Sequence, residues 1–195
     1  MTPSMTPSMT PRLTVGADKW IEAALTELAK GGIERVRVEV VAERLGVTKG
    51  GFYRRFKDRR ALLDAMLETW SAGRIAVIQQ QTALAGLTPR ERLKALVKLY
   101  TERVSAQGMA IELAIRQWAH ADQGAAAAAA RVDAARLAAV IELYRRLGLA
   151  EEDAQGRAVL FYAFIFGQSL LFLAQAPRKR ASLLAACADT LTEIG

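Results

Sequence analysis

The chain of 195 residues has few residues that cross-link proteins or bind metals, with one cysteine, Cys187, and one histidine, His120. A single cysteine excludes an intramolecular disulfide and fits a reducing cytoplasm. One Cys and one His cannot supply the ligands of a zinc site. The apolar sequence around Cys187 favours an unreactive buried thiol over a redox sensor. We expect no metal and no cofactor.

Proline and glycine are scarce beyond residue 16, and no alternating strand pattern of useful length is present. Long stretches of Ala, Leu, Arg and Glu fill the chain instead, and they predict an all-α protein. The N-terminus repeats Met-Thr-Pro-Ser twice and then reads Met-Thr-Pro. Residues 1–13 are therefore expected to form a disordered, low-complexity tail, and they lack the apolar core of a signal peptide.

The arrangements that carry enzymatic chemistry are also missing from the sequence. We find no paired catalytic carboxylates, no nucleophile accompanied by a base, and no phosphate-binding loop. The chain is therefore not expected to be an enzyme.

Acidic residues are few in the N-terminal third. Residues 1–60 hold 12 Lys and Arg against 7 Asp and Glu, whereas the remainder holds 15 against 13. Most of the net charge of +7 therefore lies in the first third. A polyanion-binding site is expected there rather than over the whole surface.

Helix start and stop signals divide the chain. Thr88, Pro89 and Glu91 form a strong helix start, and Gly108 and Pro177 are expected to end helices. The predicted helices are 15–30, 38–45, a short one after Thr48, 58–84, 88–106, 109–122, 125–147, 151–176 and 178–193.

Residues 158–176 form the one long apolar run. Its length fits a membrane span, but Gln168, Ser169 and Gln175 interrupt it, and Arg157 and Arg178 flank it. A helix that is apolar all round also suits a buried subunit interface. We favour the interface and expect no membrane association.

The most informative segment is residues 33–67, where two short helical patterns meet. Val41 and Leu45 recur at helical spacing, which predicts a helix over 38–45. Gly46 follows, where a helix end favours a residue that tolerates positive φ. Thr48 is expected to cap the next helix with its hydroxyl. The pattern predicts a helix-turn-helix.

The second motif helix is expected to bury Phe52 and Phe56, four residues apart, so that Lys49, Gly50, Tyr53 and Arg54 point away from the core. Gly50 and Gly51 each cost about 1 kcal/mol in a helix relative to alanine. Such a cost suggests that another molecule approaches the backbone closely there. Six Lys and Arg lie between residues 48 and 60. A solvated helix face is the alternative explanation for them, but their place in this motif favours DNA contact.

This segment resembles the DNA-binding domain of TetR-type transcriptional repressors. The matching residues are Ala42, 45–48, Gly50, Phe52, Tyr53, Phe56, Asp58, Arg59 and 61–63. The resemblance implies that Lys49, Gly50 and Gly51 read bases and that Tyr53 contacts a phosphate or a thymine methyl. It also implies that Arg59, in place of the usual lysine, contacts the DNA backbone.

Two positions depart from the family pattern. Arg37 replaces the usual Thr or Ser cap, and Arg55 replaces a common His; both changes favour phosphate binding. The predicted DNA-binding residues are Arg37, Thr48, Lys49, Gly50, Gly51, Tyr53, Arg54, Arg55 and Arg59.

Residues 112–119 resemble, more weakly, a core helix of the effector domain in one branch of the family. The resemblance implies a small-molecule pocket among the middle helices. The candidate lining residues are Trp70, Ile111, Ile115, Arg116, Trp118, Phe161, Tyr162 and Ile165. Ordinary core packing is the alternative for the apolar ones. Arg116 is a partner for an anionic ligand, although an ion pair with Glu112 four residues earlier is favoured.

The resemblance also implies a homodimer formed by the last two helices, for which Phe164, Leu171, Phe172, Leu184 and Leu191 are the candidate interface residues. We therefore expect a three-helix DNA-binding domain over 14–60 and a larger helical effector-binding and dimerisation domain over 61–195. The expected function is a cytoplasmic repressor released from a palindromic DNA operator by a small-molecule effector. A constitutive or low-specificity DNA-binding protein without an effector is the alternative.

Overall fold

The computed structural model describes residues 15–83, 86–100, 106–171 and 177–193. Within these ranges the protein is all-α, as predicted, and contains no strand. The helices are α1 (Ala17–Gly31), the 3-10 helix η1 (Ile33–Arg35), α2 (Val38–Leu45), α3 (Lys49–Tyr53), α4 (Arg59–Thr82), α5 (Pro89–Lys98), α6 (Ala106–Ala119), α7 (Gln123–Arg146), α8 (Glu151–Leu170) and α9 (Pro177–Thr192). The predicted tail, residues 1–13, and Phe172 lie outside the described residues.

Side chains in the sequence fix where the long helices begin. The Asp58 carboxylate accepts a hydrogen bond from the backbone N–H of Ala61 at 2.9 Å and so caps α4. Asp122 caps α7 in the same way through Ala125, also at 2.9 Å. Thr88 and Glu91 form a complete capping box at the start of α5. The predicted start at Thr88 is confirmed.

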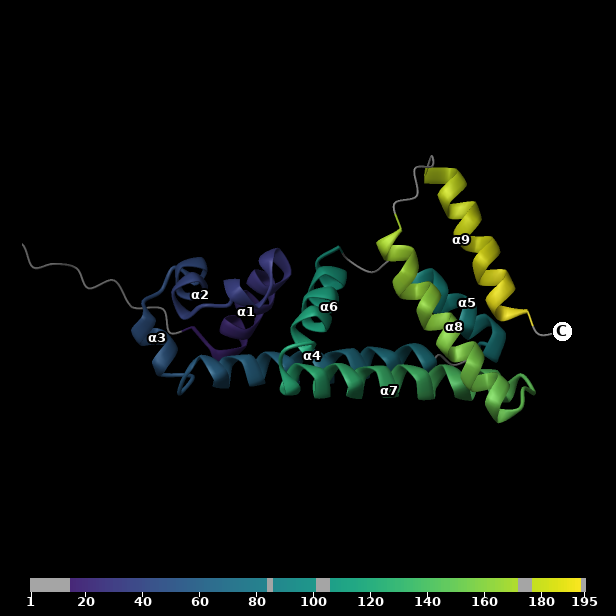
Figure 1. Ribbon diagram of the computed structural model, residues 1–195, viewed down its shortest axis with the longest axis horizontal. Coiled ribbons are helices and arrows are strands. Elements are labelled where there is room, and N and C mark those ends of the chain that lie inside the picture. Colours follow the sequence, from purple (N-terminus) through teal and green to yellow (C-terminus); the bar gives the residue numbers. More distant parts are fainter. Residues whose placement is uncertain (1–14, 84–85, 101–105, 172–176, 194–195) are drawn as a thin grey trace, which may run out of the picture.

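The molecule is elongated along α4 and α7, which pack against each other and run along its length (Figure 1). The short helices α1, α2 and α3 form a head at one end, and α5, α8 and α9 gather at the other. Between them, α6 packs against α1 and α7. The head therefore contacts the body through α6 as well as through α4.

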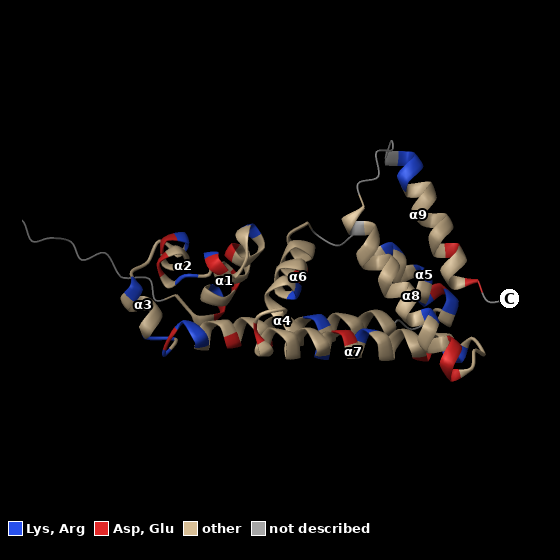
Figure 2. Ribbon diagram, in the orientation of Figure 1, with Lys and Arg blue, Asp and Glu red and all other residues tan. Residues whose placement is uncertain are grey.

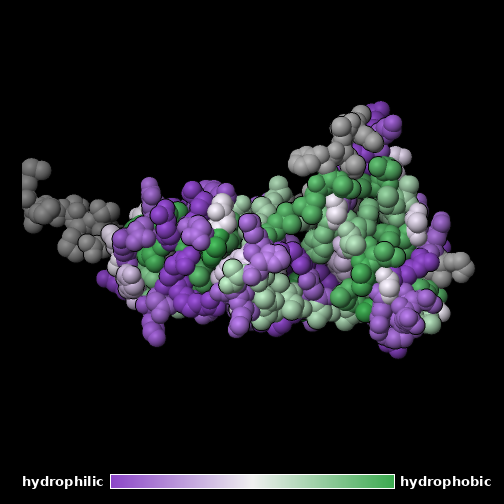
Figure 3. Space-filling view, in the orientation of Figure 1, coloured by the Kyte–Doolittle hydropathy of each residue, from purple (hydrophilic) through white to green (hydrophobic). Residues whose placement is uncertain are grey.

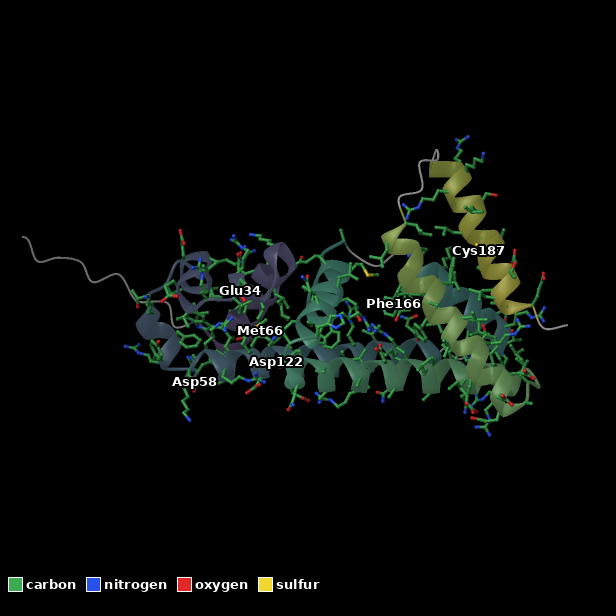
Figure 4. The ribbon with its side chains drawn as sticks, viewed as in Figure 1. Glu34, Asp58, Met66, Asp122, Phe166 and Cys187 are labelled. Atoms are coloured by element: carbon green, nitrogen blue, oxygen red, sulfur yellow. The ribbon has the colours of Figure 1, made fainter. Side chains whose placement is uncertain are left out.

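Two apolar cores hold these helices together. The first begins in the head around Trp20 and Phe52 and continues through Met66 into Trp118 and Val132. Met66 is labelled in Figure 4 at the passage from head to body. The second core joins α5, α7, α8 and α9 and includes Tyr144, Phe161 and Ile165. The head thus shares its core with the near half of the body.

Two predicted helix ends are wrong. Gly108 does not break a helix but lies inside α6, where its carbonyl accepts a hydrogen bond from Arg74 of α4 at 2.9 Å. A helical glycine costs only about 1 kcal/mol relative to alanine, which tertiary contacts can offset. α8 ends at Leu170 rather than 176, because Leu171 has an extended backbone. α9 then begins at Pro177, whose fixed φ suits a first helical position.

The apolar run does not give a membrane span: among the described residues, no helix is long and apolar enough to cross a bilayer. Cys187 lies half-buried on α9 as a free thiol (Figure 4).

Candidate DNA interface and effector region

The turn between α2 and α3 has the geometry that the sequence predicts. Gly46 adopts φ 65° and ψ 30°, a left-handed conformation that favours glycine. The N–H groups of Gly46 and Val47 bond to the carbonyls of Glu43 and Ala42, both at 3.0 Å. The chain therefore reverses within a few residues and places α3 across the end of α2.

An aromatic group anchors α3 to the head. The buried Phe52 ring lies edge-on to Trp20 at 5.5 Å between centroids and is stacked with Phe56, also at 5.5 Å. Its neighbour Tyr53 is 63% exposed. Burial of Phe52 thus turns Tyr53 outward, as predicted.

Helix α3 is shorter than the sequence suggested. It ends at Tyr53, so Arg54 and Arg55 lie in the turn that follows, and Phe56 is buried from beyond the helix. Thr48 occupies the N-cap position, but its hydroxyl makes no capping hydrogen bond, contrary to the prediction. Its carbonyl instead accepts the N–H of Gly51 at 2.9 Å.

The protein's own packing does not require glycine at positions 50 and 51. A Cβ at Gly50 would meet only the Thr48 hydroxyl oxygen, at 3.7 Å, and one at Gly51 would meet only Trp20 Cζ2, at 3.7 Å. Both are ordinary van der Waals distances. Because neither the backbone angles nor the packing calls for glycine, a partner outside the fold is the better explanation.

We expect Gly50→Ala to raise the stability of the protein and to weaken its binding to DNA. The gain in free energy of unfolding is at most about 1 kcal/mol, the helix preference of alanine over glycine. The added methyl would separate the exposed first turn of α3 from a DNA groove. Urea unfolding and fluorescence anisotropy with a selected DNA site measure the two effects. Unchanged DNA affinity with raised stability would remove Gly50 from the interface.

Lys49 is held by a neighbouring acid. Its ammonium lies 2.6 Å from a carboxylate oxygen of Glu39 on α2, and both side chains are well exposed. The hydrogen bond from Lys49 lowers the pKa of Glu39, so that carboxylate is ionised at neutral pH. To contact DNA, Lys49 must therefore first release the Glu39 carboxylate.

The predicted arginines differ in their surroundings. Arg37 and Arg54 are exposed, and Arg37 makes no capping bond at the start of α2. Arg55 donates to the carbonyl of Val15 at 3.2 Å. Arg59 donates from Nε to the carbonyl of Val36 at 2.6 Å, and from a terminal nitrogen to that of Ile33 at 2.9 Å. Arg59 therefore ties α4 to the segment before α2. Figure 2 shows the basic residues gathered around α3 and the start of α4.

Sequence reasoning missed the acid that braces the head. Glu27 of α1 is 4% exposed and accepts hydrogen bonds from Lys30, Arg35 and Arg44 at 2.8–3.1 Å. The hydrogen bond from Arg35 is the main reason that the pKa of Glu27 is lowered. These bonds hold η1 and α2 against α1. The sequence could have indicated this role, because Glu27 is an acid on the apolar stripe formed by Trp20, Ala24 and Leu28.

The structure does not bring the proposed effector residues into one group. Trp70, Ile115 and Trp118 lie in the first core with Ile111 at its edge, whereas Phe161, Tyr162 and Ile165 lie in the second. Arg116 connects the two regions, because its guanidinium lies 4.4 Å from the centroid of the Phe166 ring, on α8.

A buried ion-pair network surrounds Arg116. Its predicted pair with Glu112 is confirmed at 2.9 Å, and Arg116 also contacts Asp133 of α7 at 2.6 Å. Arg136, only 2% exposed, bonds both oxygens of Glu112, at 2.8 and 2.9 Å. Arg136 was not predicted from the sequence, although a cation among the apolar positions of α7 could have indicated a buried ion pair.

Glu112 remains charged despite its burial. Burial alone would raise its pKa, but hydrogen bonds from Arg136 and the positive charges of Arg136, Arg116 and Arg74 outweigh that effect and lower it below the ordinary 4.5. Burial of Arg136 alone would lower its pKa, but the hydrogen bond to Glu112 and the negative charge of that carboxylate raise the pKa above its ordinary value.

An apolar surface runs along α8. Val159, Leu160, Leu170 and Leu171 are 57–62% exposed, and Leu183 of α9 is 43% exposed. Figure 3 shows a broad hydrophobic area over this end of the molecule. Of the proposed dimer residues, Leu171 belongs to this surface, while Phe164 and Leu191 pack partly against the second core. Leu184 is half-buried.

Comparison with known proteins relates the head of the molecule to one family. The profile of the family described as "Bacterial regulatory proteins, tetR family" matches residues 21–66, which contain α2, α3 and the turn between them. A putative TetR-family transcriptional regulator from Rhodococcus sp. shares the fold with a TM-score of 0.71 and 25% identity, over 91% of this chain and 98% of that one. Residues 21–66 therefore match the TetR family, and the fold of the chain is that of a TetR-family regulator.

Two curated relatives are HTH-type transcriptional repressors named KstR. The protein of Mycolicibacterium smegmatis is 34% identical over 106 residues, 54% of this chain and 52% of its own length. That of Mycobacterium tuberculosis is 30% identical over 113 residues, 58% of this chain and 51% of its own. The chain thus spans about half the length of these relatives. Both relatives are named as transcriptional repressors, in keeping with the expectation that the chain is not an enzyme.

Proposed function

We propose that this TetR-family protein is a cytoplasmic, homodimeric repressor that binds a near-palindromic DNA operator and is released from it by a small-molecule effector. The main observation in support of this proposal is the outer face of α3. It combines an exposed tyrosine, Tyr53, with an exposed lysine, Lys49, and two glycines that the fold itself does not require. A short helix with such a face fits a DNA major groove.

The apolar surface of α8 supports the dimer. Large exposed apolar surfaces on monomeric proteins are uncommon and often mark interaction sites. A second copy of the chain, related by a two-fold axis, would cover this surface with the same surface of its own. Two heads held in this way would face two half-sites of one operator.

The route from effector to DNA is α4, which runs without interruption from Arg59 in the head to Thr82 in the body. Near the head, Arg60 bonds Asp122 of α7 at 2.6 Å. Deeper in the body, Arg74 bonds the carbonyl of Gly108 of α6 at 2.9 Å. A ligand that shifts α6 or α7 would move α4 and so the spacing of the two heads, with a coupling of about 1–3 kcal/mol.

Selection of bound fragments from randomised DNA, at about 150 mM salt to suppress purely electrostatic binding, tests this proposal. Recovery of one two-fold-symmetric motif is the expected result. Recovery of unenriched DNA would instead favour the low-specificity DNA-binding protein, and recovery of none would contradict DNA binding altogether.

The combined change Lys49→Ala and Tyr53→Ala should abolish enrichment of the motif and leave the fold intact, because both side chains are exposed. We expect affinity for the selected site to fall by about tenfold or more, since a specific contact contributes roughly 1–3 kcal/mol. Lys94→Ala, at the far end of the molecule, is the charge-matched control. Anisotropy titrations with the selected duplex measure the effect, and wild-type affinity in the double variant would refute the assignment of α3.

A further inference from the structure

A charged cluster joins α4, α6 and α7 in the middle of the body, and among the described residues it carries an excess of positive charge. Its members are Arg74, Arg116 and Arg136 together with Glu112 and Asp133. Three guanidinium groups and two carboxylates leave a net charge of +1. Burial of a net charge is unfavourable unless an opposite charge accompanies it. The cluster is therefore suited to accept one further anion.

One hydrogen-bond donor of the cluster is also unused. Both terminal nitrogens of Arg136 bond Glu112, but its Nε is buried and has no hydrogen-bond partner in the described structure. Buried N–H groups are nearly always paired in proteins. The vacant donor sits on a side chain that is only 2% exposed.

The cluster has an inner and an outer part. Glu112 and Arg136 are each 2% exposed, whereas Arg116 and Asp133 are 29% and 36% exposed. The Arg116 guanidinium donates to both oxygens of Asp133, at 3.0 and 2.6 Å. This fork is the standard geometry for carboxylate recognition. Asp133 also accepts a longer hydrogen bond from Arg136, at 3.3 Å. An incoming carboxylate can take the place of Asp133 on both arginines while Arg136 keeps its two bonds to Glu112.

The surroundings of the cluster are aromatic. The guanidinium groups of Arg116 and Arg136 lie 4.4 and 5.3 Å from the centroid of Phe166. The Phe166 ring lies 6.4 Å from that of Tyr162, which is largely buried. Figure 4 shows Phe166 on α8, on the side that faces α6. A ligand at this place would meet cations and aromatic rings together.

We propose that Arg116 and Arg136 bind the carboxylate of a small organic acid whose apolar part lies against Phe166 and Tyr162. The inference rests on the proposed function and names the chemical class of its effector. Release of Asp133 from Arg116 would loosen the link between α6 and α7. Glu112 and Arg74, 3.7 Å apart, would carry the change to α4.

Isothermal titration of the full-length protein with benzoate and octanoate, and with benzamide and octanamide as neutral counterparts, tests the inference. We expect the acids to bind and the amides to bind at least about tenfold more weakly, because each loses a charge-assisted hydrogen-bond pair. Trp70 and Trp118, buried in the adjoining core, provide a fluorescence readout of the same binding.

Two variants should shift the affinity in opposite directions. Arg116→Gln removes the fork and should weaken acid binding by about tenfold or more, whereas Asp133→Asn removes the competing carboxylate and should tighten it by about threefold or more. Loss of packing alone would weaken binding in both. Arg131→Gln is the control. Arg131 lies on α7, as Asp133 does, but it pairs with Glu68 and Ser71, so its replacement should leave acid binding unchanged.

Equal binding of acids and amides, no binding of either acid, or a shift of the same sign in both variants would overturn the inference. DNA selection is carried out without any acid, so its outcome is independent. A protein that selects a symmetric motif but ignores acids would keep the proposed function and lose only this effector class.

Discussion

Leu160→Glu should convert the proposed dimer to a monomer and weaken binding to a full operator by roughly a hundredfold or more, the advantage of two linked binding modules over one. Leu160 is 62% exposed and is the most exposed residue of the apolar surface of α8. A two-fold interface contains every residue twice, so one substitution buries two carboxylates without partners. Buried, unpaired charges are among the most unfavourable features that an interface can contain.

Analytical ultracentrifugation measures the assembly, and anisotropy with full-site and half-site duplexes measures DNA binding. Gln117→Glu adds the same charge at an exposed position of α6, outside the apolar surface of α8, and it should leave both properties near wild type. Half-site binding by Leu160→Glu should persist, because the head is untouched. A stable dimer in this variant would place the interface elsewhere.

The apolar run predicts an interface along α8, but it does not indicate which face of the helix is exposed. Residues 158–167 contain no polar side chain except the Tyr162 hydroxyl, so periodicity does not separate the inner face of α8 from the outer one. Phe164 was expected at the dimer interface, yet its side chain packs partly on the second core. Val159 and Leu160, one turn earlier, form the exposed surface instead. Only the packing of α8 against α7 and α9 decides between these faces.

The head was more predictable because its signals are local. Gly46 at a left-handed turn and Asp58 at a helix start act within a few residues. The length of α3 and the role of Arg59 were not predictable in this way. Arg59 reaches carbonyls 23 and 26 residues earlier in the chain, a contact that no local pattern encodes. The ion-pair network around Glu112 was missed for the same reason, apart from its one local pair with Arg116.

Loss of either partner of the inner pair should strongly destabilise the protein. Arg136→Met leaves the Glu112 carboxylate buried with fewer cations, and Glu112→Met leaves the Arg136 guanidinium buried without its main anion. Removal of one partner of a buried pair typically costs about 3–5 kcal/mol. Urea unfolding of both variants measures the loss in free energy of unfolding.

The double variant, Glu112→Met with Arg136→Met, should be more stable than the sum of the two single losses indicates. Two apolar side chains can replace a buried ion pair at little net cost, because neither charge then needs to be desolvated. The deviation from additivity measures the interaction between the two residues. Additive losses would mean that Glu112 and Arg136 stabilise the fold independently of each other.

The contribution of Glu112 should also depend on pH in a defined direction. Its pKa in the folded protein is lowered from the ordinary 4.5, so the folded state favours the ionised form. The stabilisation is therefore fully present above about pH 4.5 and disappears as pH falls through the lower, folded-state value. Glu112→Gln lacks this titration but keeps hydrogen-bonding capacity toward Arg136. The difference in unfolding free energy between wild type and Glu112→Gln should accordingly shrink on acidification. Other carboxylates titrate in both proteins and cancel in the difference, so a constant difference down to acid pH would show that Glu112 is not held as a charged group.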